Sequence, residues 1–260
     1  MPTVETDGTT IQYETEGDPE RPTVVFVPDT ATGPWLWGWQ APTLAGTHQT
    51  VVYAQRGTDG SDTDGPYTVD RLAADLEAVL ADAEVGRAHV VGAGLGGMVA
   101  LRYAREYSRA RSLTLFGVAP EGEDIDADAL AGLHPSDPTR IRQSLTLAFS
   151  DRFLAETGLT DDIVKWRKDE DAVGDPRGGH IDATLGFDAG PRYEIGLPTL
   201  VLHGVDDPVV PLSVGEALAA DLPRGRFEAV EGKRWCFVEH SAAVTDAIAE
   251  FIEESDAADD

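Results

Sequence analysis

The sequence predicts an α/β protein with a mostly parallel sheet flanked by helices and one inserted helical cap. Short β-branched runs alternate with amphipathic segments at both ends of the chain, which is typical of a parallel sheet covered by helices. The 260 residues include 42% hydrophobic side chains, enough for a large buried core. Over residues 120–190 this alternation gives way to short helical patterns. We therefore expect residues 1–119 and 191–260 to form the core and residues 120–190 to form the cap.

The first half of the core has the clearest patterns. Thr23–Val27 is a short apolar run that ends at Pro28, as expected for a buried central strand. A helix is predicted over residues 67–83, because apolar residues recur there at three- and four-residue spacing and Thr68 can cap its first turn. The other elements expected in this half are strands at Thr9–Glu16, 50–54, 88–91 and 113–116, and a helix at about 97–107.

The cap and the second half of the core follow. The cap begins with an acidic loop at residues 121–128 and has helical patterns at 141–154 and 161–168. It also includes a piece rich in Gly, Pro and charge at 174–179. The acidic tail, residues 255–260, is expected to fray. Between cap and tail we expect strands at 199–203 and 226–230 and helices at 212–221 and about 239–254.

Acidic residues dominate the charge of the chain. The sequence has 47 Asp and Glu against 20 Lys and Arg, a net charge of -27, which argues against nucleic acid and anionic membranes as partners. Self-repulsion should lower stability in dilute salt, whereas at molar salt the screening length falls to about 3 Å. Because only three basic residues are lysines, the composition resembles that of haloarchaeal proteins, and we expect folding to require salt. Equal melting temperatures in about 0.1 M and about 3 M KCl would contradict this expectation.

The sequence carries no sign of export, of a membrane span or of a bound metal. Residues 1–8 are polar and acidic, unlike a secretory signal, and no apolar run reaches membrane-spanning length. A single cysteine, Cys236, cannot form an internal disulfide, and no Cys/His spacing indicates zinc. We therefore expect a cytoplasmic protein without a metal or cofactor.

Five segments stand out in order along the chain. They are GPWLWGWQAPTL at 33–44, RGTDGSD at 56–62, VVGAGLGGMVA at 90–100, LHGVDDPVVP at 202–211 and EGKRWCFVEH at 231–240. Together they resemble landmarks of the α/β-hydrolase family, and the resemblance covers nearly the whole sequence. The cap between the strands and the acid turn is most similar to the lactonase and esterase branch. The resemblance implies an eight-stranded sheet.

The family's chemistry needs a nucleophile on a sharp turn, a histidine that takes its proton and a carboxylate that orients the histidine. The resemblance places Gly94 at the position of the nucleophile, where it has no side chain to attack with. It places Asp207 at the position of the carboxylate and Arg234 at that of the histidine. A guanidinium stays protonated and cannot act as the base. The usual nucleophile and base are therefore both missing, and no catalytic residue is assigned.

The strand that helps to form the oxyanion hole in relatives also differs. Relatives commonly end it in His-Gly, whereas this chain has Pro28 and Asp29. Pro28 lacks an N–H group, and Asp29 puts negative charge where an oxyanion would form. Branches of the family that dispense with serine do not fit either, because they need an aspartate at the turn or the histidine.

Two interpretations of this site stay open. In one, a small organic anion binds to Arg234 and to the helix N-terminus near Leu95, with Asp29, Gly94 and Asp207 around it. In the other, Arg234 forms a buried salt bridge with Asp207, or with Asp207 and Asp29 together. Both predict a contact between Asp207 and Arg234, and they differ in whether a cavity remains above Gly94.

Four other residues carry separate hypotheses. Ser61 is interpreted as a turn hydroxyl, because no histidine is placed to activate it. His180 lies in the cap, from which it could swing over the pocket. His240 is interpreted as a solvated residue at a helix end, and Cys236 as a semi-buried loop thiol.

We interpret the chain as a family member without the serine hydrolase machinery, acting as a small-molecule binder or as a subunit of an assembly. One alternative is a hydrolase of esters or lactones in which Asp29, Asp207 or a cap histidine acts on water. The other is a structural or interaction protein whose pocket is filled. The sequence does not indicate the oligomeric state.

Overall fold

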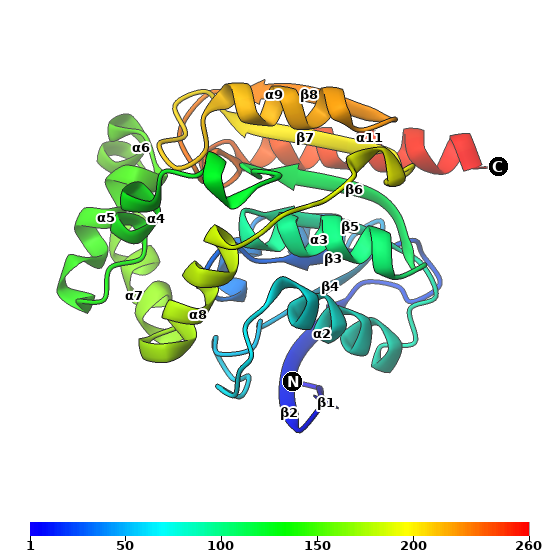
Figure 1. Ribbon diagram of the computed structural model, residues 1–260, viewed down its shortest axis with the longest axis horizontal. Helices are drawn as coiled ribbons and strands as arrows, with labels where there is room; N and C mark the ends of the chain where they lie inside the picture. Colours follow the sequence, from blue (N-terminus) through cyan, green and yellow to red (C-terminus); the bar gives the residue numbers. More distant parts are fainter. Residues whose placement is uncertain (260) are drawn as a thin grey trace.

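A computed structural model describes residues 1–259 and contains one eight-stranded sheet. The strands are β1 (Thr3–Thr6), β2 (Thr9–Glu16), β3 (Thr23–Val27), β4 (Gln49–Tyr53), β5 (Ala88–Ala93), β6 (Ala110–Phe116), β7 (Thr199–Gly204) and β8 (Gly225–Val230). Their order is β1-β2-β4-β3-β5-β6-β7-β8 (Figure 1). Pairs β1–β2 and β2–β4 are antiparallel, and the other pairs are parallel. The predicted fold class is confirmed.

The centre of the sheet consists of the strands that read as continuous apolar runs. Every residue of β3, β5 and β7 is buried, as expected for parallel strands covered on both faces. The edge strand β1, by contrast, alternates exposed and half-buried residues. The sequence analysis missed β1, whose four residues are too short for a clear alternating pattern.

Helices cover both faces of the sheet. On one face lie α2 (Val69–Asp82), α3 (Leu95–Glu106) and α9 (Leu212–Asp221), and on the other lie α1 (Gln40–Leu44) and α11 (Ser241–Asp259) (Figure 1). Thr68 caps α2, as predicted, by accepting a hydrogen bond from the Arg71 amide. Within residues 1–259, no helix is both long enough and apolar enough to cross a membrane.

Five helices form a group beside the carboxyl ends of the strands, on the left of Figure 1. The predicted single pattern over 141–154 is two helices, because Phe149 is extended and Ser150 caps the second one. The Gly- and Pro-rich piece at 174–179 is the first half of a helix. Its buried face packs on the core, and such packing outweighs poor helix propensity. The helices are α4 (Ala127–Leu133), α5 (Ile141–Ala148), α6 (Asp151–Glu156), α7 (Thr160–Glu170) and α8 (Gly174–Leu185).

The end of the chain differs from its prediction. A short helix, α10 (Cys236–Glu239), precedes α11, which continues to Asp259. The expectation of a fraying tail is wrong for its first residue, because the Ser255 hydroxyl is buried and donates to the Phe251 carbonyl at 2.7 Å. Residue 260 lies outside the described part of the chain.

Candidate functional site

All residues of the predicted site meet at the carboxyl ends of the parallel strands. Asp29 follows β3, Gly94 follows β5, Asp207 follows β7 and Arg234 follows β8. Parallel strands end at the same edge of a sheet, where ligand sites of such folds are found. Sequence positions far apart therefore build one cluster.

Gly94 occupies the sharp turn between β5 and α3. Its φ is +47°, a conformation that favours glycine, and its amide donates to the Phe116 carbonyl at 2.9 Å. Leu95 is the first residue of α3 and is fully buried. Gly96 lets α3 approach β3, because a Cβ there would lie 2.2 Å from the Val27 carbonyl oxygen.

Arg234 binds both acidic residues of the site. Its Nε and Nη2 donate to the two oxygens of Asp29 at 3.0 and 3.1 Å. Its Nη1 donates to Asp207 Oδ2 at 3.2 Å and to the Gly117 carbonyl at 2.6 Å. The contact between Asp207 and Arg234 that the sequence predicts is present, and Asp29 joins it with a bidentate geometry.

Neutral donors satisfy the remaining oxygen positions. Asp29 accepts from the Thr30 amide at 2.7 Å and from Trp235 Nε1 at 3.0 Å. Asp207 Oδ1 accepts from the Val209 and Val210 amides at 2.8 and 3.2 Å. The two carboxylates and the guanidinium thus form a buried, hydrogen-bonded cluster, which we call the ion cluster.

Burial and charge oppose each other in the ion cluster. Asp29 is 1% exposed and Arg234 is 3% exposed. Burial is the largest single influence and would raise the pKa of Asp29, but the charge of Arg234 and the hydrogen bonds from Arg234 and Trp235 together outweigh it and lower this pKa to about 2. Burial would likewise lower the pKa of Arg234, but Asp29 and Asp207 raise it above its ordinary value. Asp29 and Arg234 are therefore both charged at neutral pH, and Arg234 cannot exchange a proton as a catalytic base does.

The space above Gly94 is occupied. A Cβ atom at this position would lie 1.7 Å from Asp29 Oδ1 and 2.2 Å from Arg234 Nη2. None of five cavities found among residues 1–259 has Gly94, Asp207 or Arg234 in its wall. The geometry therefore favours the salt-bridge interpretation over a ligand bound directly to Arg234.

The cap histidine is fixed in place. His180 Nδ1 accepts from the Ala31 amide at 3.1 Å, and its Nε2 donates to the Arg56 carbonyl at 2.9 Å. Burial lowers its pKa to about 4, so the ring is neutral. The adjoining Thr184 hydroxyl lies 3.0 Å from that of Thr30. His180 therefore attaches α8 to the loop after β3, and the structure gives it no freedom to swing over the cluster.

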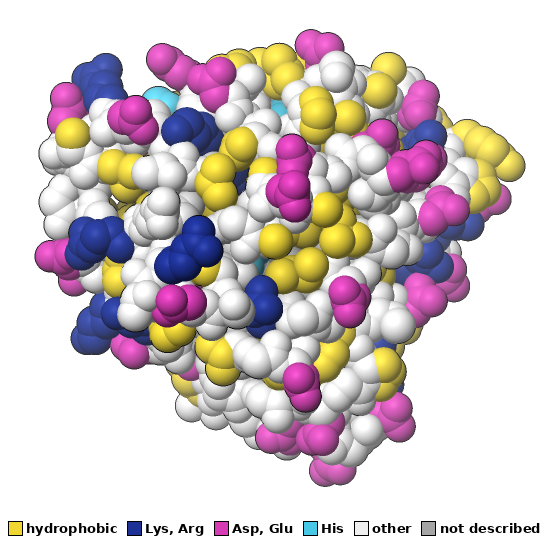
Figure 2. Space-filling model, turned by 60° about the vertical axis from the view of Figure 1, so that its left-hand side comes forward, with side chains coloured by type: hydrophobic (Ala, Val, Ile, Leu, Met, Phe, Trp, Pro, Cys, Tyr) yellow, Lys and Arg dark blue, Asp and Glu magenta, His cyan; other side chains and the backbone are white. Residues whose placement is uncertain are grey.

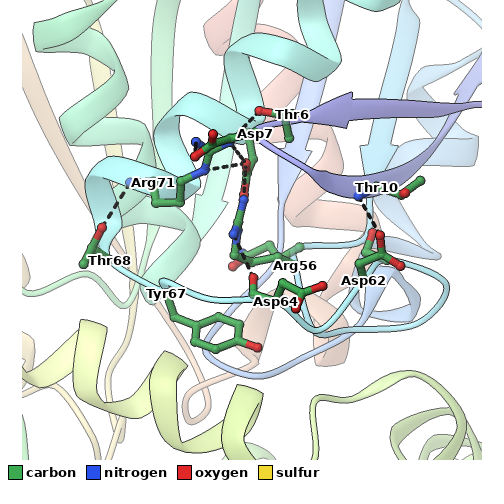
Figure 3. Close-up of polar contacts among 12 residues, drawn as sticks. Thr6, Asp7, Thr10, Arg56, Asp62, Asp64, Tyr67, Thr68 and Arg71 are labelled. Carbon is green, nitrogen blue, oxygen red and sulfur yellow. Dashed lines mark hydrogen bonds and ion pairs between the residues drawn. The ribbon is translucent and has the colours of Figure 1, made fainter.

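The loop after β4 is tied down by a second buried arginine. Arg56 binds Asp75 of α2 through Nε and Nη2 at 2.6 and 2.7 Å, and its Nη1 donates to the Asp64 carbonyl at 2.8 Å (Figure 3). Arg71 extends this network to Asp7 at 3.0 Å. Within the same loop, the Ser61 hydroxyl donates to the Ala54 carbonyl at 2.8 Å. Ser61 is thus a turn hydroxyl, as interpreted from the sequence.

The last two residues with separate hypotheses are Cys236 and His240. Cys236 is 1% exposed at the start of α10, so the expectation of a semi-buried loop residue is wrong. Burial raises its thiol pKa to about 12, which leaves little thiolate. His240 lies at the end of α10, as expected, but it is only partly exposed, and its Nε2 is buried without a hydrogen-bond partner among the described residues, 3.9 Å from the Glu239 carboxylate.

A serine, a histidine and a carboxylate do meet elsewhere in the molecule. His89 Nδ1 lies 2.8 Å from the Ser112 hydroxyl, and its Nε2 lies 3.2 Å from Asp256 Oδ1. His89 and Ser112 are near the amino ends of β5 and β6, opposite the ion cluster, and each is only 1% exposed. A substrate cannot reach this hydroxyl, so the arrangement supports packing and not nucleophilic catalysis.

Sequence reasoning missed three contributors to the site. Gly117 supplies a carbonyl to Arg234, Trp235 donates to Asp29, and His134 lies in the adjoining cap. Trp235 follows Arg234 directly, a signal that could have been used, but the other two depend on tertiary packing. Among residues 1–259, no group of three or more His, Cys, Asp and Glu is placed to hold a metal ion.

Comparison with known proteins agrees with the fold. Residues 24–248 match the Alpha/beta hydrolase family. 3-Oxoadipate enol-lactonase 1 of Acinetobacter baylyi is 26% identical over 247 residues, covering 89% of each chain. The 2-hydroxymuconate semialdehyde hydrolase of Pseudomonas sp. is 28% identical over 252 residues, covering 87% of this chain and 86% of the relative.

Solved structures give the same result. The enol-lactonase of Burkholderia xenovorans superposes with a TM-score of 0.85 at 20% identity, over 97% of this chain and all of that one. A hydrolase of Pseudomonas aeruginosa superposes with a TM-score of 0.82 at 27% identity, over 96% of both chains. The sheet order, the turn at Gly94 and a family match over most of the length agree, and the chain belongs to the alpha/beta hydrolase family.

Proposed function

We propose that this protein is a non-hydrolytic member of its family that binds a small molecule beside a closed catalytic site. The observation that carries the proposal is the occupied space above Gly94, where a nucleophilic side chain would overlap Asp29 and Arg234. A cation held by two carboxylates cannot take a proton from a nucleophile. At this site the chain therefore has neither the nucleophile nor the general base that the serine mechanism needs.

A cavity next to the ion cluster supports the binding role. It has a volume of about 500 Å³ and lies between the cap helices and Ala31, in the loop after β3. This volume is in the usual range for small-molecule sites. Relatives include enol-lactonases and a semialdehyde hydrolase, so lactones and esters are the first compounds to test.

Turnover assays test the loss of hydrolysis. We expect no hydrolysis of p-nitrophenyl esters or lactones above the buffer rate, in dilute or in molar KCl. Hydrolysis that disappears in Asp207→Asn would overturn the proposal in favour of a hydrolase with a non-standard group. Hydrolysis that persists in Asp207→Asn comes either from a contaminating enzyme or from another group, such as Asp29. Purification to constant specific activity separates these two cases, and hydrolysis that remains after it would also overturn the proposal.

Calorimetry with the same compounds tests the binding role. We expect a saturable heat of binding for at least one of them, and no product in the cell afterwards. If no compound in a broad panel binds, the alternative of a structural or assembly subunit is favoured. Size measurements in solution would then show whether the chain associates.

A further inference from the structure

The cavity beside Ala31 is separate from the ion cluster. Its wall includes His134 after α4, residues 167–168 of α7 and residues 171–177, which lead into α8. Gly94, Asp207 and Arg234 are absent from this wall. A ligand in the cavity would therefore be recognised by cap residues and not by the residues of the closed site.

The one carboxylate among the described wall residues is already satisfied. Asp171 Oδ2 accepts from Arg167 Nε at 2.7 Å. Its Oδ1 accepts from Trp35 Nε1 at 2.8 Å and from the Gly33 amide at 3.1 Å. Arg167 is also fully engaged, since its other nitrogens donate to Ser144 and to the Leu133 carbonyl. This pair neutralises itself and leaves no free negative charge on the wall.

Two other cations of the wall have no carboxylate partner among residues 1–259. Lys168 is exposed and forms no ion pair there. Arg177 Nη1 donates to the His134 carbonyl at 2.8 Å, while its Nε is buried without an acceptor. Two cations without a carboxylate partner in the described part of the chain thus line one cavity, in a chain that has 47 acidic residues. Both offer donors to a ligand.

His134 adds a neutral donor. Its Nδ1 faces Arg167 Nη2 at 3.5 Å, and because a guanidinium only donates, Nδ1 is the acceptor and Nε2 carries the proton. Burial, reinforced by Arg167, lowers the pKa of His134 well below its usual value, so the ring stays neutral. The residue is 2% exposed, yet its Nε2 has no partner. A buried donor without an acceptor is costly, and a ligand oxygen would satisfy it.

We propose that this cavity binds a small organic carboxylate through Lys168, Arg177 and His134. The unused polar side chains of these three residues are all donors, two of them positively charged, and a carboxylate offers about four acceptor positions. Figure 2 shows Lys and Arg side chains gathered on the cap side of the molecule, although the net charge is -27. The inference rests on the proposed binding role and adds the chemistry of the ligand.

Calorimetry with matched ligands tests the inference. The probes are benzoate, acetate and adipate, each paired with its uncharged amide, at constant ionic strength. We expect at least one carboxylate to bind at least about tenfold more tightly than its amide, the effect of one charge-assisted hydrogen bond. If the amides bind as tightly as the acids, the carboxylate assignment is overturned while the binding role stands. If neither class binds, the assignment is overturned as well.

Variants locate the site. Lys168→Gln should weaken carboxylate binding about tenfold and leave amide binding unchanged. The matched control is Lys165→Gln, because Lys165 is an exposed cation on the same helix, outside the cavity wall. Equal losses in both variants would show that only net charge matters and would overturn the site. His134→Phe keeps a ring of similar size but removes the N–H donor, so the ratio of carboxylate affinity to amide affinity should fall. A lower melting temperature with an unchanged preference would mean that His134 only supports packing.

Discussion

Two buried arginines, Arg234 and Arg167, adjoin Trp235, and their surroundings differ. Arg234 precedes this tryptophan in the sequence and binds two carboxylates, Asp29 and Asp207, while Trp235 Nε1 donates to Asp29. Arg167 stacks over the Trp235 ring at 5.1 Å and binds one carboxylate, Asp171. The first arrangement fills the space around it. The second borders a cavity of about 500 Å³.

The difference shows how side chains can fill the space at one arginine while a cavity remains beside the other. At the ion cluster each strong donor of Arg234 has an acceptor, and two negative charges hold one positive charge. In the cavity wall that residues 1–259 form, the only carboxylate, Asp171, already accepts hydrogen bonds from other residues of the protein. Lys168, Arg177 and His134 therefore keep donors without a carboxylate partner among the described residues. The balance of donors and acceptors therefore separates the closed region from the open one. Substitutions in each region test this contrast.

Clearing the space above Gly94 and restoring a serine and a histidine should produce ester hydrolysis. The triple variant Asp29→Gly, Gly94→Ser, Arg234→His removes the carboxylate that occupies the nucleophile space and supplies a nucleophile and a base. We expect ester hydrolysis about tenfold or more above the parent, at or below the low end of a general-base contribution. The double variant that keeps Asp29 should stay silent, because this carboxylate lies where the new side chain would be. Silence in both would implicate Pro28, which has no N–H for an oxyanion.

Removing the cation of the ion cluster should cost the most stability. Arg234→Met leaves Asp29 and Asp207 buried without a counter-charge, and we expect the free energy of unfolding to fall by about 3–5 kcal/mol. Urea denaturation measures the change. Adding Asp29→Asn and Asp207→Asn should restore more than half of the loss. No recovery would mean that Arg234 acts through packing and not through its charge.

The same change on the open side should cost less. Arg167→Met leaves a single carboxylate, Asp171, which keeps donors from Gly33 and Trp35, so we expect a loss of about 2 kcal/mol. Denaturation under identical conditions gives the comparison. A loss equal to that of Arg234→Met would refute the idea that the number of carboxylates separates the two regions.

Glu170 is a carboxylate without a paired cation among residues 1–259, and its effect on the free energy of unfolding should depend on pH in the opposite sense to that of Asp29. Burial raises the pKa of Glu170, which adjoins Asp171, to about 7, and the nearby charges of Asp59, Asp171 and Asp169 add to this. Because the folded pKa exceeds the unfolded value of 4.5, Glu170 costs stability as pH rises from about 4.5 to about 7.

The test is Glu170→Gln, which keeps an oxygen for the Trp35 amide. Melting curves should agree near pH 4.5, and above pH 7 the variant should be more stable by about 1–2 kcal/mol, a value reduced for solvent screening. The contribution of Asp29 runs the other way and is lost only as pH falls toward about 2. A parent that is as stable as the variant above pH 7 would argue against the raised pKa.

Salt should have little effect on the difference in stability between Arg234→Met and Arg167→Met. We expect KCl at about 3 M to raise the melting temperature of every variant by screening surface repulsion. The difference between Arg234→Met and Arg167→Met should stay the same, because buried pairs are screened much less. A difference that shrinks with salt would indicate that water reaches the ion cluster.

Much of the fold followed from sequence patterns. Thr9–Glu16, Thr23–Val27 and Leu212–Asp221 have the predicted bounds, because their apolar periodicity agrees with their tertiary surroundings. α8 was missed, since its glycines and proline are poor helix formers and only packing against the core holds them.

The site was predictable only in part. A landmark at a strand end fixes where Asp207 and Arg234 lie, so their contact could be expected. Whether Asp29 would join them, and whether a cavity would remain, depended on side-chain directions that no local pattern encodes. His134 is the clearest case, because its position depends on how the cap helices pack and on no neighbour in the sequence.

The indole N–H signal of Trp235 can report on both the ion cluster and the cavity that Arg167 lines. Its indole N–H points to the Asp29 carboxylate, while its ring packs against the guanidinium of Arg167, which lines the cavity. In a nitrogen-labelled sample the five tryptophans give at most five indole signals, of which this one should be shifted by its charged acceptor. A single resonance would thus report disruption of the closed side through its hydrogen bond and occupancy of the open side through its ring.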